Sequence, residues 1–312
     1  MVNVKKKFIM YSYIILTIIH FSYVFNEHRF NEVDQEIEIK HEQNNINKFI
    51  LKHKSIDAII IGGSNSAVGL SAKLLSEITN KNFYNLSQSS EGDNSTNYYK
   101  TVISKTSSLD KKKVRLILYS TLKYLNSDET EFKEYYNSTK KNKIKLIPKI
   151  NILGRFISAG TINSILTNFN KNSISPKMNN DKKYGEGSFK THFNINLKSF
   201  EFNKSISLDL VIKSLIDIKR KYNKSFPNAK FVVVTPLIYN KNPEFQNVFI
   251  SKLSCELEKN EIEFISQPPV TSIQPIWTDA IHLNHEGRKL RTNELYKLLR
   301  NKYNLKSLFY EN

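Results

Sequence analysis

The chain has 312 residues, of which 39% are hydrophobic and 12% aromatic, which excludes a disordered protein and suffices for one sizeable α/β domain. Its 47 Lys and Arg residues against 29 Asp and Glu give a formal net charge of +18, which favours an anionic neighbour. The sequence shows no zinc-finger, helix-turn-helix or RNP-type motif, so we do not expect nucleic acid as a partner. The single cysteine, Cys255, excludes an internal disulfide, and the apolar spacing around it predicts a buried helix position.

The N-terminal segment predicts a membrane anchor. Three lysines, Lys5–Lys7, precede residues 8–25, which carry no charged side chain. At about 1.5 Å per residue, such a helix is just long enough to cross a hydrocarbon core of roughly 30 Å. No small-residue cleavage site follows, so we expect residues 1–25 to remain as a single-pass anchor with a cytoplasmic N-terminus. A buried core helix is the alternative.

A polar, charged stretch follows the predicted anchor. Residues 26–54 have sparse apolar positions and predict a stalk that is partly helical. The basic cluster at the N-terminus then places the remaining chain, residues 55–312, in the periplasm or outside the cell.

Short apolar, β-branched runs predict the strands of a buried sheet. They lie at residues 56–61, 83–86, 114–119, 231–235 and, more weakly, 261–265. Apolar residues at helical spacing predict helices at 65–77, 208–222, 246–259 and 285–303. Strands that alternate with helices indicate a parallel sheet covered on both faces, with the chemistry at the carboxyl ends of the strands. We therefore expect a three-layer α/β/α, flavodoxin-like domain of about five parallel strands.

Residues 126–205 break this alternation and predict an insertion. They are rich in Asn, Lys and Ser and contain no convincing buried strand. Between Ile150 and Phe169, apolar residues recur at roughly helical spacing, interrupted by Gly154 and Gly160. Two interpretations stay open. In the first, the insertion is functional and forms a cap over the active site or a contact with the membrane surface. In the second, it is a segment packed against the edge of the domain.

The turn after the first predicted strand carries the candidate nucleophile, Ser64, in Gly62-Gly63-Ser64-Asn65-Ser66. Acyl transfer by serine needs an exposed hydroxyl on a constrained turn, an imidazole base and a carboxylate that orients the base. Ser64 lies where a buried strand gives way to a helix, whose positive end suits a developing oxyanion. A helix start or a phosphate loop remains an alternative, although G-x-G-x-x-G spacing and a Walker lysine are missing.

The base and the carboxylate are expected near the C-terminus, within residues 277–288. Asp279 and His282 are three residues apart, so one turn brings them onto the same side. Of the seven histidines, only His282 and His285 lie outside the predicted anchor, stalk and insertion, and we expect His285 to help begin the last helix. The sequence therefore predicts a triad of Ser64, His282 and Asp279, which needs no metal or organic cofactor.

These residues resemble the motifs of the SGNH (GDSL-like) hydrolase superfamily, in which a serine follows the first strand and an Asp-x-x-His precedes the last helix. The stretch from Tyr84 to Gly92 is similar to the second block of that family. The resemblance implies Ser90 or Gly92 as an oxyanion donor, with Asn65 as a further oxyanion or substrate-binding residue. The third block normally reads Gly-x-Asn-Asp, whereas residues 120–124 read Ser-Thr-Leu-Lys-Tyr, so the usual asparagine is missing.

The predicted anchor and the altered third block are similar to a membrane-anchored branch that modifies envelope polymers. That branch includes the teichoic-acid D-alanylation protein and polysaccharide O-acetylation proteins. The resemblance implies a serine acyltransferase or esterase that acts on O-acyl groups of a surface glycan or related anionic envelope polymer. An integral-membrane acyl donor protein is the further partner that it implies.

Other functions remain open. The missing asparagine favours a non-catalytic envelope assembly or polymer-binding protein on the same fold. A lipid-directed esterase or thioesterase could use residues 150–169 at the membrane. An α/β-hydrolase is disfavoured, because its nucleophile follows several strands and not the first.

Overall fold

The computed structural model describes residues 39–87, 95–122, 178–181, 184–189, 198–202, 206–272, 276–303 and 309. By its contacts the chain divides into two compact units, Met1–His41 with Lys143–Ser175 and Glu42–Asn142 with Pro176–Asn312. The sheet and helices below belong to the second unit, apart from residues 39–41 at the start of one helix. The predicted anchor and most of the predicted insertion lie outside the described residues. Within the described ranges, no helix is long and apolar enough to cross a membrane.

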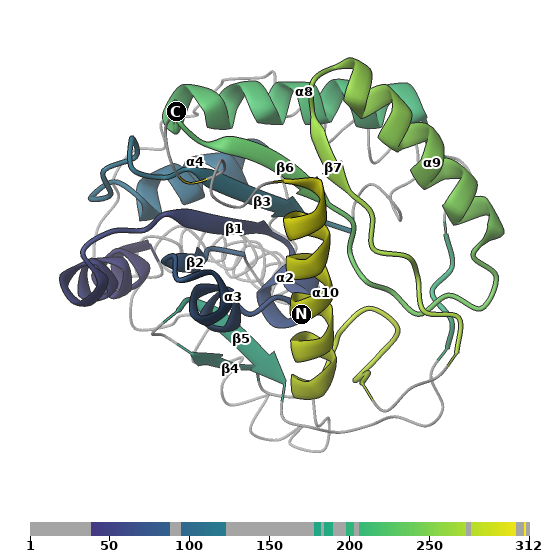
Figure 1. The fold of residues 1–312 in the computed structure, drawn as a ribbon, viewed down its shortest axis with the longest axis horizontal. Helices are drawn as coiled ribbons and strands as arrows, with labels where there is room; N and C mark the ends of the chain where they lie inside the picture. Colours follow the sequence, from purple (N-terminus) through teal and green to yellow (C-terminus); the bar gives the residue numbers. More distant parts are fainter. Residues whose placement is uncertain are drawn as a thin grey trace, which may run out of the picture. The chain divides into compact units, whose positions relative to one another are not determined.

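Five parallel strands form the central sheet, in the order β2-β1-β3-β6-β7 (Figure 1). Their bounds are β1 Ala58–Gly62, β2 Phe83–Asn85, β3 Leu116–Ser120, β6 Lys230–Val234 and β7 Glu263–Ile265. The chain passes from β1 to one neighbour, β2, and then returns to the other side of β1 for β3. This reversal is typical of flavodoxin-like sheets, in which ligands bind beside the carboxyl ends of the strands where the strand order reverses. The predicted α/β class and five-stranded parallel sheet are confirmed.

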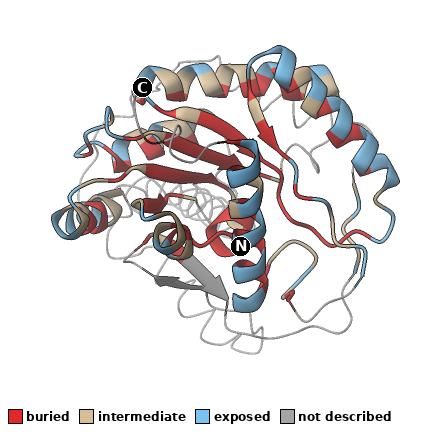
Figure 2. Cartoon of the chain, viewed as in Figure 1, coloured by how far each residue is buried: buried red, intermediate tan, exposed pale blue. Residues whose placement is uncertain are grey.

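Burial on both faces explains why these strands are unbroken apolar runs in the sequence. Every residue of β1 is buried, as the red strands in Figure 2 illustrate. Parallel pairing aligns the strand ends, and Gly62 at the end of β1 lies beside Ser120 at the end of β3. Residues that follow β1, β3, β6 and β7 therefore meet at one edge of the sheet, although they are far apart in sequence.

Helices cover both faces of the sheet (Figure 1). One face carries α4 (Ser95–Lys105), α8 (Leu208–Ser225) and α9 (Glu244–Lys259). The other carries α2 (Ser64–Gly69), α3 (Ala72–Thr79) and α10 (His285–Lys302). The three expected layers are present, and α4 is a helix that the apolar spacing did not predict.

The helix expected over residues 65–77 is two helices. The backbone at Leu70 is extended, and Ser71 begins α3 by accepting a hydrogen bond from the Leu74 N–H at 3.1 Å. A serine that bonds the backbone competes with helix continuation, which explains the break.

One side-chain position differs from expectation, and the apolar face of α10 is incomplete. Cys255 is exposed on α9, because the buried face of that helix carries Phe249, Leu253 and Leu257 instead. Leu290 on α10 is 42% exposed. The inner face of α10 includes a charged residue, Arg291, beside its leucines.

A helix over residues 39–53 packs on the edge of the domain, within the range expected to be a stalk. Ile46 and Phe49 on this helix are buried in the main core. The Phe49 ring meets the Tyr84 ring edge-on at 5.2 Å, and the Tyr84 hydroxyl bonds the Glu42 carboxylate at 2.6 Å. The core of the domain therefore extends into this segment.

A small antiparallel hairpin, β4 (Met178–Asp181) and β5 (Glu186–Phe189), lies in the range expected to hold no convincing strand. The hairpin is bound to β2, because Asn85 N–H donates to the Tyr184 carbonyl at 2.9 Å. Gly185 has a φ of +70°, and a Cβ there would lie 2.0 Å from the Asn85 carbonyl oxygen. Only glycine permits this close approach. These residues of the insertion thus pack against the edge of the domain.

Candidate active site

The turn that carries Ser64 is fixed by contacts to β3. Gly62 has a φ of +153°, and a Cβ on it would lie 1.7 Å from the Ser120 carbonyl oxygen, so a larger residue cannot stand there. The same oxygen accepts a hydrogen bond from the Ser66 hydroxyl at 2.7 Å and from the Gly63 N–H at 3.3 Å. Ser64 therefore begins α2 at the carboxyl edge of the sheet on a turn that has little freedom.

The loop over residues 276–284 carries Asp279 and His282 and is closed at its base. Trp277 and Leu283 form an antiparallel bridge, and Asn284 N–H donates to the Ile276 carbonyl at 2.9 Å. A small cluster of buried apolar side chains packs at the base of the loop. Its members are Leu237, Tyr239, Ile276, Trp277 and Leu283. Burial of these side chains holds the loop against the segment that follows β6.

Asp279 orients His282 through both carboxylate oxygens. Oδ1 accepts hydrogen bonds from the backbone N–H groups of Ile281 and His282, each at 2.8 Å. Oδ2 lies 2.6 Å from His282 Nδ1. Because an ionised carboxylate only accepts hydrogen bonds, this contact places the imidazole proton on Nδ1 and leaves the Nε2 lone pair free to accept.

The pKa of Asp279 lies below its ordinary value of 3.8. Partial burial by itself raises this pKa, but the hydrogen bond and the charge of His282, with the two backbone N–H groups, outweigh burial. The carboxylate is therefore ionised at neutral pH and can support a positive charge on the imidazole.

The structure joins the three predicted residues in one chain of hydrogen bonds. His282 Nε2 lies 2.8 Å from Ser64 Oγ, although the two residues are 218 positions apart in the chain. The serine hydroxyl can donate its proton to the imidazole, whose other nitrogen faces Asp279. This is the hydrogen-bond order that a serine nucleophile requires.

The residues expected around the oxyanion have different outcomes. Ser90 and Gly92 lie outside the described residues. The side chain of Asn65 does not face a substrate: it is 1% exposed and its amide donates to the carbonyls of Leu237, at 3.1 Å, and Ile281. The donors of this side chain are already used inside the protein, so the expected role of Asn65 stays a prediction that can rest only on its backbone N–H.

A fully buried arginine lies beneath the nucleophile turn and was not among the predicted site residues. Arg291 Nη1 donates to the carbonyl and side-chain oxygens of Asn65, at 2.9 and 2.6 Å. Nη2 donates to Ser120 Oγ and the Thr235 carbonyl, each at 3.2 Å, and Nε donates to Gln267 Oε1 at 3.2 Å. Burial lowers the pKa of Arg291 to about 9, so it remains charged at neutral pH.

Arg291 could have been noticed in the sequence. It lies four residues before Leu295 and eight before Leu299, both of which are buried on the inner face of α10. A cation at an apolar helical spacing indicates a buried charge with a specific set of partners.

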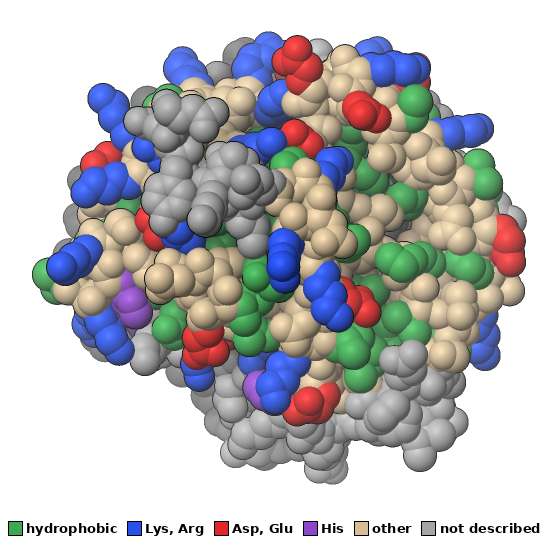
Figure 3. Space-filling model, viewed as in Figure 1, with side chains coloured by type: hydrophobic (Ala, Val, Ile, Leu, Met, Phe, Trp, Pro, Cys, Tyr) green, Lys and Arg blue, Asp and Glu red, His purple; other side chains and the backbone are tan. Residues whose placement is uncertain are grey.

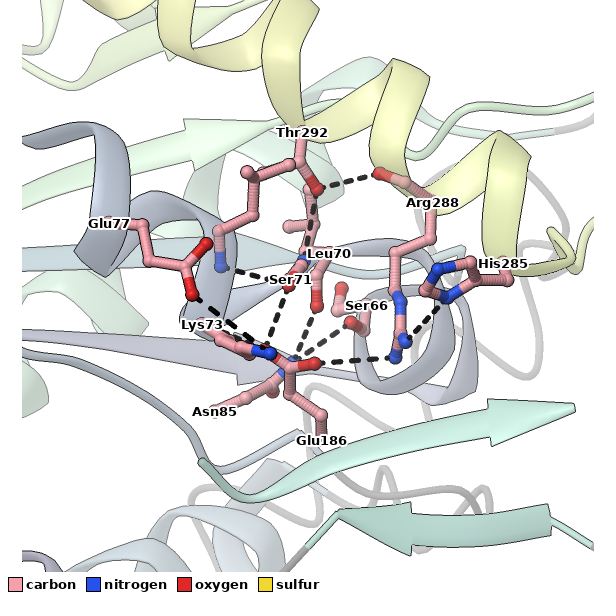
Figure 4. Close-up of polar contacts among 11 residues, drawn as sticks. Ser66, Leu70, Ser71, Lys73, Glu77, Asn85, Glu186, His285, Arg288 and Thr292 are labelled. Atoms are coloured by element: carbon pink, nitrogen blue, oxygen red, sulfur yellow. Dashed lines mark hydrogen bonds and ion pairs between the residues drawn. The ribbon is translucent and has the colours of Figure 1, made fainter. Parts of the chain in front are cut away.

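A second buried arginine on α10, Arg288, holds the hairpin (Figure 4). Its Nη1 lies 3.4 Å from Glu186 Oε2, and both side chains are buried. Glu186 Oε1 also accepts hydrogen bonds from Ser71 Oγ at 3.0 Å and from Lys73 N–H at 2.5 Å. The carboxylate therefore caps the positive end of α3 while pairing with α10.

The described side chains on the face drawn in Figure 3 form no large patch of a single charge. On the face in Figure 3, Lys and Arg side chains are spread over several elements among neutral and acidic groups. Among the described side chains, no group of three or more His, Cys, Asp or Glu residues could hold a metal ion.

No family model matches the chain, and no curated protein matches it in sequence. Among solved structures, it matches an acetyl xylan esterase from the rumen bacterium Butyrivibrio proteoclasticus at 12% identity and a TM-score of 0.40. It also matches a family two carbohydrate esterase from Clostridium thermocellum at 9% identity and a TM-score of 0.41. Each match covers 80% of this chain and 65% of the other, so the chain spans less than two thirds of either esterase. Similarity this low leaves the function to be argued from the site itself.

Proposed function

We propose that the protein is a serine hydrolase of the SGNH type that cleaves or transfers O-acyl groups. The observation that carries this proposal is the hydrogen-bonded line from Ser64 Oγ through His282 to Asp279, at 2.8 and 2.6 Å. Three residues from two distant segments meet with the donors and acceptors in the order that acyl transfer needs.

The first half of the reaction forms an acyl-enzyme. Ser64 Oγ attacks the ester carbonyl carbon while its proton passes to His282 Nε2, and Asp279 stabilises the resulting imidazolium. The ester C–O bond then breaks, and the leaving alcohol takes the proton from Nε2. The backbone N–H of Ser64, at the start of α2, is the proposed donor to the developing oxyanion.

The second half restores the serine. Water, or a hydroxyl of an acceptor, gives its proton to His282 Nε2 and attacks the acyl carbon. The bond to Ser64 Oγ breaks and the proton returns to that oxygen. Water as the nucleophile gives an esterase, and a sugar hydroxyl gives an acyltransferase.

The proposed substrate is an O-acylated polysaccharide or related polymer of the cell envelope. Two features of the sequence support it: the lysine-flanked apolar segment of residues 8–25, and the net charge of +18, which favours an anionic polymer. On this proposal the N-terminus anchors the protein in the membrane and the hydrolase domain lies outside the cytoplasm, where an integral-membrane protein supplies acyl groups to a transferase. The competing proposal is a polymer-binding protein without catalysis, which the missing third-block asparagine favours.

A fluorophosphonate probe tests the proposal on the full chain. We expect the wild type to be labelled and Ser64→Ala not to be labelled, with parallel loss of p-nitrophenyl acetate hydrolysis. Ser254→Ala, a serine on α9, is the matched control and should be labelled like the wild type. No labelling of the wild type would favour the binding protein, and equal labelling of Ser64→Ala would remove Ser64 from the role.

A further inference from the structure

The Asn65 side chain connects the two halves of the candidate site. Asn65 follows Ser64 in the chain, and Ile281 precedes His282. The Asn65 amide donates to the Ile281 carbonyl and, at 3.1 Å, to the Leu237 carbonyl. One buried side chain therefore joins the nucleophile turn to the loop that presents the base.

The direction of this amide is set by the chemistry of its partners. A guanidinium has only donors, so the Asn65 atom that lies 2.6 Å from Arg291 Nη1 must be the oxygen. Backbone carbonyls only accept, so the nitrogen must face Leu237 and Ile281. Arg291 also donates to the Asn65 backbone carbonyl at 2.9 Å, which fixes the main chain as well as the side chain. The amide can satisfy all these partners in one orientation only.

Arg291 has no carboxylate partner among the described residues, and the oxygens to which it donates are all neutral. Its charge is therefore not cancelled locally. A cation without a counter-ion nearby polarises the groups to which it donates. Because Arg291 bonds the oxygen of the Asn65 amide, the amide N–H becomes a stronger donor toward Ile281.

We propose that Asn65 and Arg291 are positioning residues that set the alignment of Ser64 with His282. Arg291 orients the Asn65 amide, and the amide holds the loop of residues 276–284 at the distance at which His282 Nε2 meets Ser64 Oγ. Neither residue touches the reacting atoms. This inference rests on the proposed function, because alignment matters only if Ser64 is a nucleophile.

The decisive variant is Asn65→Asp. The aspartate has nearly the same shape and gains an ion pair with Arg291, which offsets part of the loss at the two carbonyls, so we expect the variant to fold. Its carboxylate cannot donate to Ile281 or Leu237 and repels both carbonyls. The loop should loosen, and fluorophosphonate labelling should slow by roughly 10²-fold, the effect of about 1 Å of misplacement.

Asn85→Ala and Asn65→Ala form a matched control pair. Asn85 is equally buried, at 1% exposure, and its amide donates to the carbonyls of Ser66 and Leu70 at 3.1 and 3.2 Å (Figure 4). It therefore supports the other end of α2 without contacting the loop. We expect both alanine variants to lose stability, but only Asn65→Ala to lose labelling strongly, with Asn85→Ala remaining within about threefold of the wild type.

A second readout does not depend on activity. Trp277 is the single tryptophan of the chain and is fully buried at the base of the loop. Acrylamide quenching of its fluorescence should increase in Asn65→Asp and stay at the wild-type level in Asn85→Ala.

The outcomes separate the two proposals. If the wild type is not labelled, the proposed function fails, and quenching still decides whether Asn65 holds the loop. If the wild type is labelled and folded Asn65→Asp reacts at the same rate, the positioning role is overturned. Equal quenching of Asn65→Asp and Asn85→Ala would overturn it as well.

Discussion

Two buried arginines, one turn apart on α10, behave differently. Arg288 pairs with Glu186 and binds the β4–β5 hairpin to the domain, whereas Arg291 is fully buried and bonds neutral oxygens beneath Ser64. Removing Arg288 leaves the Glu186 carboxylate buried without its cation, whereas removing Arg291 leaves several hydrogen-bond acceptors without donors. The cation with a counter-charge fastens a peripheral segment, whereas the cation without one bonds the turn that carries the candidate nucleophile.

The largest effect should come from Arg291→Met, which keeps most of the volume and removes every donor. Acceptors on Asn65, Ser120, Thr235 and Gln267 would be left unpaired, each at a cost of about 1–3 kcal/mol. We expect the free energy of unfolding to fall by at least about 3 kcal/mol, measured by urea unfolding. Arg291→Lys, which keeps the charge but not the planar fork, should lose less. A variant as stable as the wild type would contradict the organising role.

Arg288→Met should have a smaller effect on stability and little on chemistry. Glu186 keeps its hydrogen bonds from Ser71 and Lys73 at the start of α3, so its charge is still partly compensated. We expect a loss of about 2 kcal/mol in urea unfolding. Fluorophosphonate labelling should stay within about threefold of the wild type. If labelling fell as far as in Arg291→Met, the two arginines would not differ in role.

Replacing both partners of the Arg288–Glu186 contact measures the coupling energy between them. Glu186→Gln with Arg288→Met removes the charge that Arg288→Met alone leaves buried. The double variant should therefore be more stable than the sum of the two single losses predicts, by about 1 kcal/mol in a double-mutant cycle. Strict additivity would mean that the 3.4 Å contact contributes no coupling.

The smallest effect concerns Asp279, whose side chain is 53% exposed and therefore screened by water. Its folded-state pKa lies below the ordinary 3.8, so its stabilising contribution is present above pH 3.8 and is lost as pH falls through the lower folded value. The difference in unfolding free energy between wild type and Asp279→Asn should shrink as the pH falls below 3.8. Urea unfolding at several pH values below 5 measures this, and a difference that grows as the pH falls below 3.8 would reverse the assigned direction.

The sequence predicted the sheet well because its strands are buried on both faces. The run over residues 56–61 has no polar side chain except Asp57, and β1 lies within it apart from Gly62. The helix α4 was missed because Ser95, Thr96 and Asn97 at its start are polar and lack apolar spacing. Local pattern is informative where apolar residues follow the period of the element, and the start of α4 has no such residues.

The candidate site was predicted from residue types and their spacing within short stretches of the sequence. Asp279 and His282 stand three apart, and this spacing is enough to bring their side chains together in one loop. The catalytic role of the triad stays a prediction, as do the anchor, the stalk and the domain boundaries. Ser90 and Gly92 stay predictions too.

The sequence by itself determined the α/β class and the residue types that acyl transfer requires, because apolar runs and an Asp-x-x-His spacing are local properties. Only the tertiary structure decided how these parts are held. Arg291 donates to acceptors at or just after the carboxyl ends of β1, β3, β6 and β7, and the Asn65 side chain turns inward to Ile281. The physical reason is that parallel strands bring their carboxyl ends to one edge, where partners more than 200 residues apart, such as Asn65 and Arg291, become neighbours.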